Sequence, residues 1–138
     1  KDTGEGICVI DLDTVMPGLS INDFGDSIRF GANHSAEDER DLSKVNFDLP
    51  LFDIYTKGFL EGAAGTLTDA EKEYLPWGAK LMTLECGIRF LTDYLEGDTY
   101  FKIHRDGQNL DRCRTQFKLV ADMENVWDEM ASIVKKYS

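Results

Sequence analysis

Two aspartates at alternate positions, Asp11 and Asp13, follow an apolar run near the amino terminus. The run is typical of a strand buried on both faces, so it predicts a strand over residues 7–12, ended by a turn at Pro17-Gly18. Residues two apart on a strand point to the same side, and two adjacent carboxylates suit Mg²⁺. A strand that simply ends in solvated acidic residues is the alternative, because Asp is common in turns.

A second group of reactive side chains lies far along the chain. Glu85, Arg89 and Asp93 recur every four residues within an apolar stretch, so they share one side of a predicted helix. Charges on a mostly buried helix are costly unless they are paired or used. The three therefore form a ladder of ion pairs, or Arg89 reaches into a ligand cleft.

Tyr100 lies in a predicted loop after that helix, together with Phe101, His104 and Arg105. A tyrosine offers an apolar ring face and a hydroxyl, the mixed character that carbohydrate sites use. The alternative is that Tyr100 only fills the loop against the core.

Four longer stretches of the sequence resemble a known family. They are Val9–Thr14, Asn22–Arg29, Leu84–Asp98 and Asn109–Gln116. Together they are similar to the aminoglycoside phosphotransferase and choline kinase superfamily, and most similar to its branch of bacterial N-acetylhexosamine 1-kinases. The resemblance covers nearly the whole chain.

The resemblance implies a fold and a set of site residues. The fold would be the C-terminal lobe of a protein-kinase-like structure, mainly α with a short β-hairpin or strand at the N-terminus. Asp11 would bind Mg²⁺ between the phosphates of ATP. Asp13, chosen as a metal residue for its spacing, would act as a second ligand, through water, or only through its charge. Arg89 and Tyr100 would hold the sugar substrate, and Asp23 would support the catalytic loop through hydrogen bonds.

The tripeptide Asp23-Phe24-Gly25 also matches the metal-binding element of protein kinases. It falls inside a predicted helix, whereas a metal-binding aspartate is expected at the end of a strand. We therefore favour a structural role for Asp23 over a role as a metal ligand. An acidic residue at a helix N-terminus, favoured by the helix dipole, is compatible with that role.

Two parts of a complete kinase are missing from the sequence. No His-x-Asp-x-x-x-x-Asn pattern and no Gly-rich nucleotide loop occur in it. The chain begins at Lys1, and Thr3–Gly6 is typical of a hairpin turn that needs a preceding strand. We expect the carboxy-terminal part of a longer enzyme, which is inactive when isolated.

The function predicted for the complete enzyme is ATP- and Mg²⁺-dependent phosphorylation of a sugar, with an N-acetylhexosamine at its anomeric hydroxyl as the preferred substrate. Choline or an aminoglycoside is the alternative acceptor. A different class of function is a non-catalytic helical domain that binds a partner or self-associates, and we expect that an isolated chain can form a homodimer through exposed apolar surface.

Composition narrows the classes of partner. The 138 residues carry 26 acidic and 15 basic side chains, a net charge of −11, which argues against nucleic acid as the main partner. No apolar run approaches the length of a membrane span. Cys8, Cys86 and Cys113 lie far apart in apolar patterns, which predicts buried, reduced thiols and a cytoplasmic protein.

The elements that must position these residues are mostly helices. We expect a metal-binding strand and turn over residues 1–18 and a helical, substrate-binding part over residues 19–138. The predicted helices are residues 21–32 with Ser20 as N-cap, a helix capped by Asp48 and closed near Gly62 and Gly65, a short helix opened by Thr68, a long helix 77–96 and a final helix 109–136. Residues 33–46 are predicted to be a solvated connection.

Overall fold

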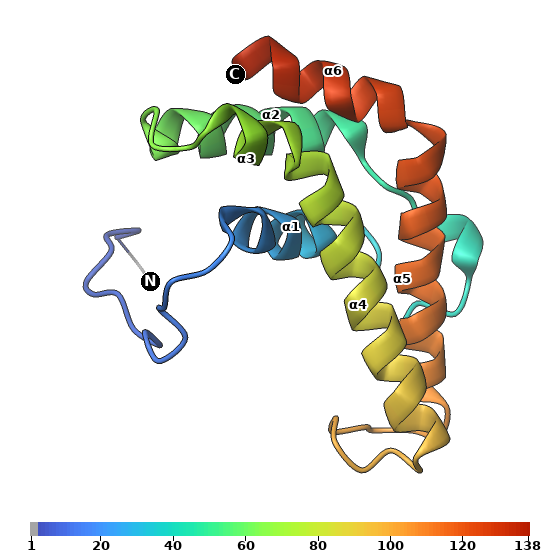
Figure 1. The fold of residues 1–138 in the computed structure, drawn as a ribbon. Coiled ribbons are helices and arrows are strands. Elements are labelled where there is room, and N and C mark those ends of the chain that lie inside the picture. Colours follow the sequence, from blue (N-terminus) through green and yellow to red (C-terminus); the bar gives the residue numbers. More distant parts are fainter. Residues whose placement is uncertain (1–2) are drawn as a thin grey trace.

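Two long helices, α4 (Leu75–Leu95) and α5 (Gln108–Asn125), lie side by side and form the centre of the molecule (Figure 1). The structure is a computed structural model that describes residues 3–138. Within those residues it is mainly helical and contains no strand. The other elements are α1 (Ser20–Gly31), η1 (Leu42–Lys44), α2 (Leu49–Ala63), α3 (Asp69–Glu73) and α6 (Trp127–Tyr137).

Helix α1 crosses α4 at a point where both helices carry glycine. A Cβ at Gly25 would overlap the backbone carbonyl of Gly78, and a Cβ at Gly78 would overlap the carbonyl of Ile21. Phe24, next to this crossing, is fully buried and packs against Phe52 with ring centres 5.8 Å apart. The tripeptide Asp23-Phe24-Gly25 thus has a packing explanation that needs no metal.

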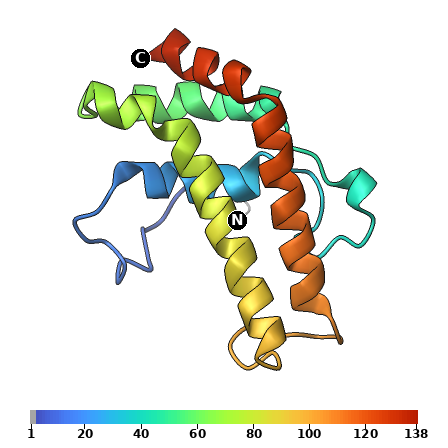
Figure 2. The ribbon, with the colours of Figure 1, turned by 45° about the vertical axis from the view of Figure 1, so that its right-hand side comes forward.

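The hydrophobic core lies where α1, α2, α4 and α6 meet. Its aromatic centre is Phe24, and the rings of Phe52 and Phe59 pack against it edge to face. Figure 2 shows α2 and α6 above α1, at the N-terminal end of α4. The buried core members are Phe24, Ile28, Ala32, Phe52, Leu75, Ala79, Met123, Met130 and Val134.

Two predicted helix starts are confirmed, and one is wrong. Asp48 caps α2 by accepting a hydrogen bond from the Leu51 amide at 2.8 Å, and Thr68 forms a reciprocal capping box with Glu71. Ser20 had been expected to cap α1, but the N-cap position is Leu19, which makes no side-chain cap. The Ser20 hydroxyl instead donates to Glu71 of α3, at 2.9 Å.

The predicted final helix over residues 109–136 is two helices. Helix α5 ends at Asn125, and α6 begins at Trp127 after a non-helical residue, Val126. The turn between them lets Trp127 pack edge to face on Trp77, with ring centres 4.8 Å apart. A single straight helix would direct the α6 side chains away from the core, whereas the bend buries Met130.

The strand predicted over residues 7–12 is not formed, and this prediction is corrected. Residues 7–12 have no regular structure and no strand partner, and Asp11 has a left-handed φ of 63°. A turn follows from Leu12 to Val15. A strand needs a neighbouring strand for its amide and carbonyl groups, and residues 3–138 supply none. The apolar side chains are therefore exposed, Ile7 by 95%. Thr3–Gly6 likewise forms no hairpin within the described chain, and residues 1 and 2 of the predicted 1–18 unit lie outside it.

The connection over residues 33–46 is more tightly bound than predicted. Val45 is buried, and the Arg105 guanidinium donates to the Asp38 carboxylate at 3.2 Å. The hydroxyl of Thr115 on α5 donates to the Glu37 carbonyl. The polar composition predicts a solvated loop, but these long-range hydrogen bonds hold residues 33–46 against α5 and the loop before it.

No helix within residues 3–138 is long and apolar enough to cross a membrane. Of the three cysteines, Cys113 is buried and Cys86 is partly buried, as predicted. Cys8 is exposed, because it belongs to the unpaired N-terminal segment. The prediction that all three thiols are buried is therefore wrong for Cys8.

Candidate functional site

One buried carboxylate fixes the loop that follows α4. Asp93, in the last turn of α4, accepts hydrogen bonds from the backbone amides of Thr99, Tyr100 and Phe101 at 2.9, 2.7 and 3.0 Å. The side chain of Asn109 donates a further hydrogen bond at 2.8 Å. Burial disfavours the ionised form of Asp93, but these four donors outweigh burial and lower the pKa of the carboxyl group.

The anchored loop places two aromatic rings beside Arg89. The guanidinium carbon of Arg89 lies 5.8 Å from the centre of the Tyr100 ring and 5.4 Å from that of Phe101. Both distances are within the range of a cation–π contact. Arg89 and Tyr100, which the resemblance assigns together to the sugar, lie close to each other in the structure, because Asp93 lies one turn beyond Arg89 on the same helix and binds the Tyr100 amide.

The predicted ladder of ion pairs along α4 forms only in part. Arg89 lies 3.7 Å from the Glu85 carboxylate. Asp93 makes no ion pair with Arg89 in the described structure, since its two oxygens accept from the loop amides and from Asn109. About half of the Arg89 and Glu85 side chains is exposed, so the pair is accessible to a ligand.

Arg89 stands on the rim of a polar cavity of about 380 Å³ between α1, α4 and α5. This volume lies within the range of about 300–1,000 Å³ that is usual for small-molecule sites. Phe90 and Phe101 supply apolar surface, and charged groups of both signs surround it. The lining residues that carry charge are Asp26, Arg29, Glu37, Glu85, Arg89, Lys102 and Arg112.

The charges around the polar cavity are ordered by ion pairs. The Arg29 guanidinium donates to Asp26 at 3.0 Å and to Glu37 at 2.9 Å. Burial opposes the charge on Arg29, but the hydrogen bonds to Asp26 and Glu37 outweigh it, so the pKa of Arg29 is raised. Arg112 lies 3.5 Å from Glu37 and 5.4 Å from the centre of the Phe90 ring. The cavity therefore offers both donors and acceptors in fixed positions.

Cys86 also lines the polar cavity, but its thiol is not activated as a nucleophile. Cys86 is half-buried on α4, and burial raises the pKa of its thiol above the ordinary value. A thiol with a raised pKa is protonated at neutral pH and reacts slowly. Cys86 thus adds soft apolar surface to the cavity wall.

A second cavity opens on the other side of Arg89. It has a volume of about 350 Å³, and Thr92, Glu96 and Tyr100 line it together with Arg89. The surface of this second cavity is mainly apolar, and the aromatic residues Tyr100 and Phe101 line it. Arg89 and Phe101 border both cavities, so a ligand in either one would touch them.

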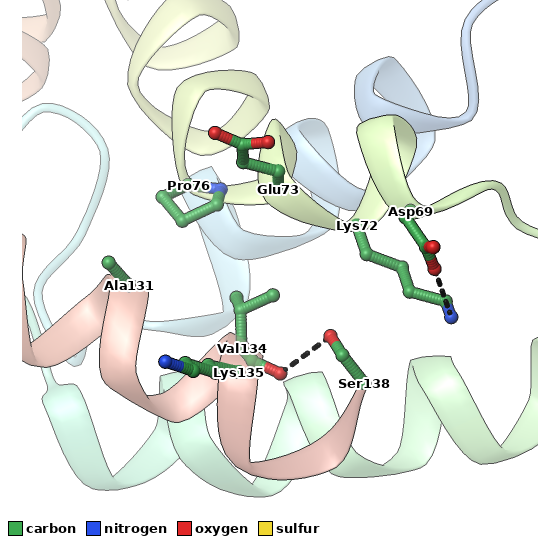
Figure 3. A pocket seen from close by; sticks show the side chains of 8 residues that line it. All are labelled: Asp69, Lys72, Glu73, Pro76, Ala131, Val134, Lys135 and Ser138. Carbon is green, nitrogen blue, oxygen red and sulfur yellow. Dashed lines mark hydrogen bonds and ion pairs between the residues drawn. The ribbon is translucent and has the colours of Figure 1, made fainter.

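A third cavity, of about 380 Å³, lies between α3 and α6 and contains none of the residues selected from the sequence (Figure 3). Pro76, Ala131 and Val134 give it a mainly apolar wall. Lys72 pairs with Asp69 at 3.3 Å and the Ser138 hydroxyl donates to a backbone carbonyl, whereas Glu73 and Lys135 also line the cavity without such a partner among the described residues. The third cavity therefore combines a mainly apolar wall with one carboxylate and one ammonium group.

The predicted metal ligands lie apart from Arg89, Tyr100 and the two cavities beside them. Asp11 and Asp13 are exposed in the N-terminal segment, which lies beside α1 and away from the loop after α4 (Figures 1 and 2). Within residues 3–138, no group of three His, Cys, Asp or Glu side chains is arranged to hold a metal ion. Two carboxylates still fit Mg²⁺, because this ion is often held by one or two carboxylates while phosphates and water complete the shell.

Asp23 is exposed in the first turn of α1, and its carboxylate makes no hydrogen bond or ion pair to the described residues. The predicted support of a catalytic loop stays a prediction. The favourable position of an acidic side chain at a helix N-terminus agrees with the structural interpretation.

Several residues of the polar cavity were missed from the sequence. Arg29 and Arg112 lie within the stretches that carry the family resemblance, but their types and spacing did not distinguish them from ordinary surface residues. Asp93 was assigned to the ion-pair ladder because of its spacing. Only the course of the loop, which spacing does not encode, reveals the role of Asp93.

No model of a known protein family matches the chain.

Proposed function

We propose that this chain is the acceptor-binding part of an ATP- and Mg²⁺-dependent small-molecule kinase, and that the acceptor is a sugar of the N-acetylhexosamine class. The observation that carries the proposal is the contact of Tyr100 with Arg89, the side chain that borders both cavities. The resemblance of the sequence to N-acetylhexosamine 1-kinases assigns the sugar to these same two side chains.

The chemistry of the polar cavity supports a sugar as ligand. A sugar carries many hydroxyl groups, each of which donates and accepts hydrogen bonds, together with apolar C–H faces. Guanidinium groups supply donors, carboxylates supply acceptors, and aromatic rings contact C–H faces. The cavity combines all three, for example in Arg89, Glu37 and Phe101.

The paired charges also argue against a strongly charged acceptor. Arg29 is already paired with Asp26 and Glu37, and Glu85 is paired with Arg89. A cationic acceptor such as choline or an aminoglycoside would need an unpaired carboxylate or an aromatic cage. A neutral polyol instead inserts between the paired groups without leaving a buried charge alone.

In the proposed enzyme the roles are divided between parts. Arg89 and Tyr100 bind and orient the sugar, and the anchored loop holds both in place before the sugar arrives. Asp11, with Asp13, would hold Mg²⁺, which neutralises charge between the phosphates of ATP. The proposal assigns the catalytic base and the nucleotide loop to another part of the enzyme, since their motifs do not occur in this sequence.

The first experiment is titration of the 138-residue chain with N-acetylglucosamine and N-acetylgalactosamine, followed by calorimetry and by NMR shifts of the Phe101 and Arg89 amides. We expect binding of at least one sugar. Arg89→Ala should weaken it about tenfold or more, because a hydrogen bond to a charged group contributes about 1.5–3 kcal/mol. Tyr100→Ala should weaken it as well.

Arg114→Ala is the matched control, because Arg114 is a half-exposed arginine on α5 outside the residues that line the polar cavity. It should bind sugar like the unmodified chain, and so should Asp11→Ala. Equal loss of sugar binding in Arg114→Ala and Arg89→Ala would contradict the assigned site. Binding of choline or an aminoglycoside in place of both sugars would contradict the acceptor class.

A further inference from the structure

Helix α4 carries an apolar stripe that faces solvent. Helices α1 and α5 pack on two other sides of α4, through Gly78 and Gly87 respectively. Six apolar residues, spaced alternately by four and by three positions, line the remaining side of α4. We call this row of side chains the α4 stripe. Its members are Trp77, Leu81, Leu84, Ile88, Leu91 and Leu95.

The α4 stripe is exposed where a core helix would be covered. Leu81 and Ile88 are about half exposed, at 52% and 50%, and Leu95 is exposed by 74%. A row of apolar side chains this long on one helix marks an interaction surface. Alternate spacing of three and four is the spacing at which two helices interlock their side chains.

We propose that the α4 stripe binds the same stripe of a second copy of this chain, in an antiparallel arrangement. The stripe is self-complementary: when two copies run antiparallel about a two-fold axis at residue 86, every apolar residue faces an apolar residue, as an isologous interface requires. The facing pairs are Leu84 with Ile88, Leu81 with Leu91, and Trp77 with Leu95.

Charges beside the stripe favour the antiparallel direction. Glu85 and Arg89 lie along one edge of it, and in the antiparallel pair the same edges of the two copies meet. Arg89 of each copy then comes level with Glu85 of the other, about two residues or 3 Å apart along the axis. The two cross pairs are related by the two-fold axis and add to each other, and they outnumber the one like-charge approach, between the two Glu85 side chains, which lie at the same offset of about 3 Å along the axis.

Parallel packing lacks this complementarity. In a parallel pair Lys80 would be the residue that faces Glu85 of the other copy. Lys80 is already paired with Glu124 of α5, and its ammonium lies 5.6 Å from the Trp77 ring and 5.7 Å from the Trp127 ring. The Glu85 carboxylate pairs with Arg89 of its own chain at 3.7 Å but is half exposed, so an arginine of a second copy can approach it as well.

The decisive experiment is sedimentation of the whole chain over a range of micromolar concentrations. We expect a dimer that Ile88→Asp dissociates, with the dissociation constant raised more than tenfold and the helical circular dichroism unchanged. Ile54→Asp is the matched control, because Ile54 is an isoleucine on α2 with 70% exposure and lies off the stripe. The control should remain dimeric.

Charge reversal tests the register. Glu85→Arg should weaken the dimer, and the double change Glu85→Arg with Arg89→Glu should restore it. Oxidation of a variant with Cys8 and Cys86 replaced by serine tests the direction. A disulfide between two copies of Leu81→Cys/Leu91→Cys, together with none between two copies of Leu81→Cys alone, supports the antiparallel pair. A disulfide between two copies of Leu81→Cys alone indicates parallel packing and overturns it.

Two further results would overturn the proposal. The first is a monomer at every concentration, which would leave the stripe to some other partner. The second is a dimer that is lost when residues 1–16 are deleted, because the exposed apolar residues of that segment would then form the interface. The sugar-binding proposal does not enter either result.

Discussion

The N-terminal segment, residues 3–19, and the loop over residues 96–107 are both irregular, and both follow or contain an aspartate and several large apolar side chains. The loop has a fixed course because Asp93 accepts hydrogen bonds from three successive backbone amides and Asn109 holds the same carboxylate. The segment has no such anchor, and Ile10 in it is 77% exposed.

The difference shows what fixes a chain without regular structure. Backbone amides need acceptors, and apolar side chains need a covered surface. In the loop, one carboxylate satisfies the amides, and Phe101 packs on Phe90 with ring centres 4.8 Å apart. In the described part of the segment, the Glu5 and Val15 amides donate to acceptors only two and three residues away, and the apolar side chains stay exposed. The aspartate that organises its surroundings is therefore Asp93 and not Asp11.

The largest effect should come from Asp93→Ala, compared with Asp11→Ala. Removal of the Asp93 carboxylate leaves the three loop amides and the Asn109 side chain without their acceptor. We expect a fall of several degrees in Tm and amide exchange faster by about an order of magnitude at residues 99–101. Asp11→Ala should leave both unchanged. Equal Tm values for the two variants would remove the contrast between the regions.

The second effect is a loss of stability in acid. The pKa of Asp93 is lowered in the folded chain, whereas an unfolded aspartate titrates near about 3.9. Its contribution is therefore complete above the unfolded pKa and is lost as pH falls through the lower, folded pKa. The difference in unfolding free energy between the unmodified chain and Asp93→Asn should shrink below about pH 4. A difference that stays constant down to lower pH would show that the charge on Asp93 does not matter.

A smaller effect is expected for Asn109→Ala. The Asn109 side chain is fully buried, donates to Asp93 and Asp98 at 2.8 Å each, and accepts from Arg112 at 2.9 Å. Its loss leaves buried polar groups with fewer partners and should lower the unfolding free energy by about 1–3 kcal/mol in urea denaturation. Asn125→Ala, at the end of α5 and exposed, is the control with little change expected.

The smallest effect should follow deletion of residues 1–16. Helix α1 begins at Ser20, and the apolar side chains of the deleted part are exposed. We expect the unfolding free energy to change by less than about 0.5 kcal/mol, as for surface changes in general. A loss of several kcal/mol in the same denaturation experiment would mean that the segment packs on the helices, contrary to the comparison above.

Much of the helical structure was predictable from the sequence, because apolar periodicity and caps are local signals. Asp48 and Thr68 marked the starts of α2 and α3, and the apolar faces predicted the long helix that is α4. The bend at Val126 was not predictable, because apolar residues keep their helical spacing in the sequence from α5 into α6. That bend depends on the contact of Trp127 with Trp77, which are fifty positions apart in the chain.

The candidate site was predictable only in outline. Arg89 and Tyr100 were selected, and their proximity follows from Asp93, whose spacing suggested an ion pair. The strand prediction was wrong for a related reason. An apolar run states that a segment can be buried, but burial needs a partner elsewhere, and residues 3–138 contain no strand to pair with it.

The packing of Trp77 on Trp127 has a spectroscopic consequence. The sequence contains two tryptophans, and both lie at this junction of α4 and α6 with their rings 4.8 Å apart. The tryptophan fluorescence of the chain therefore originates from one place, with the Lys80 ammonium near both indoles. The wavelength of maximum tryptophan emission reports separation of α6 from α4, and opening of the loop around Tyr100 leaves it unchanged.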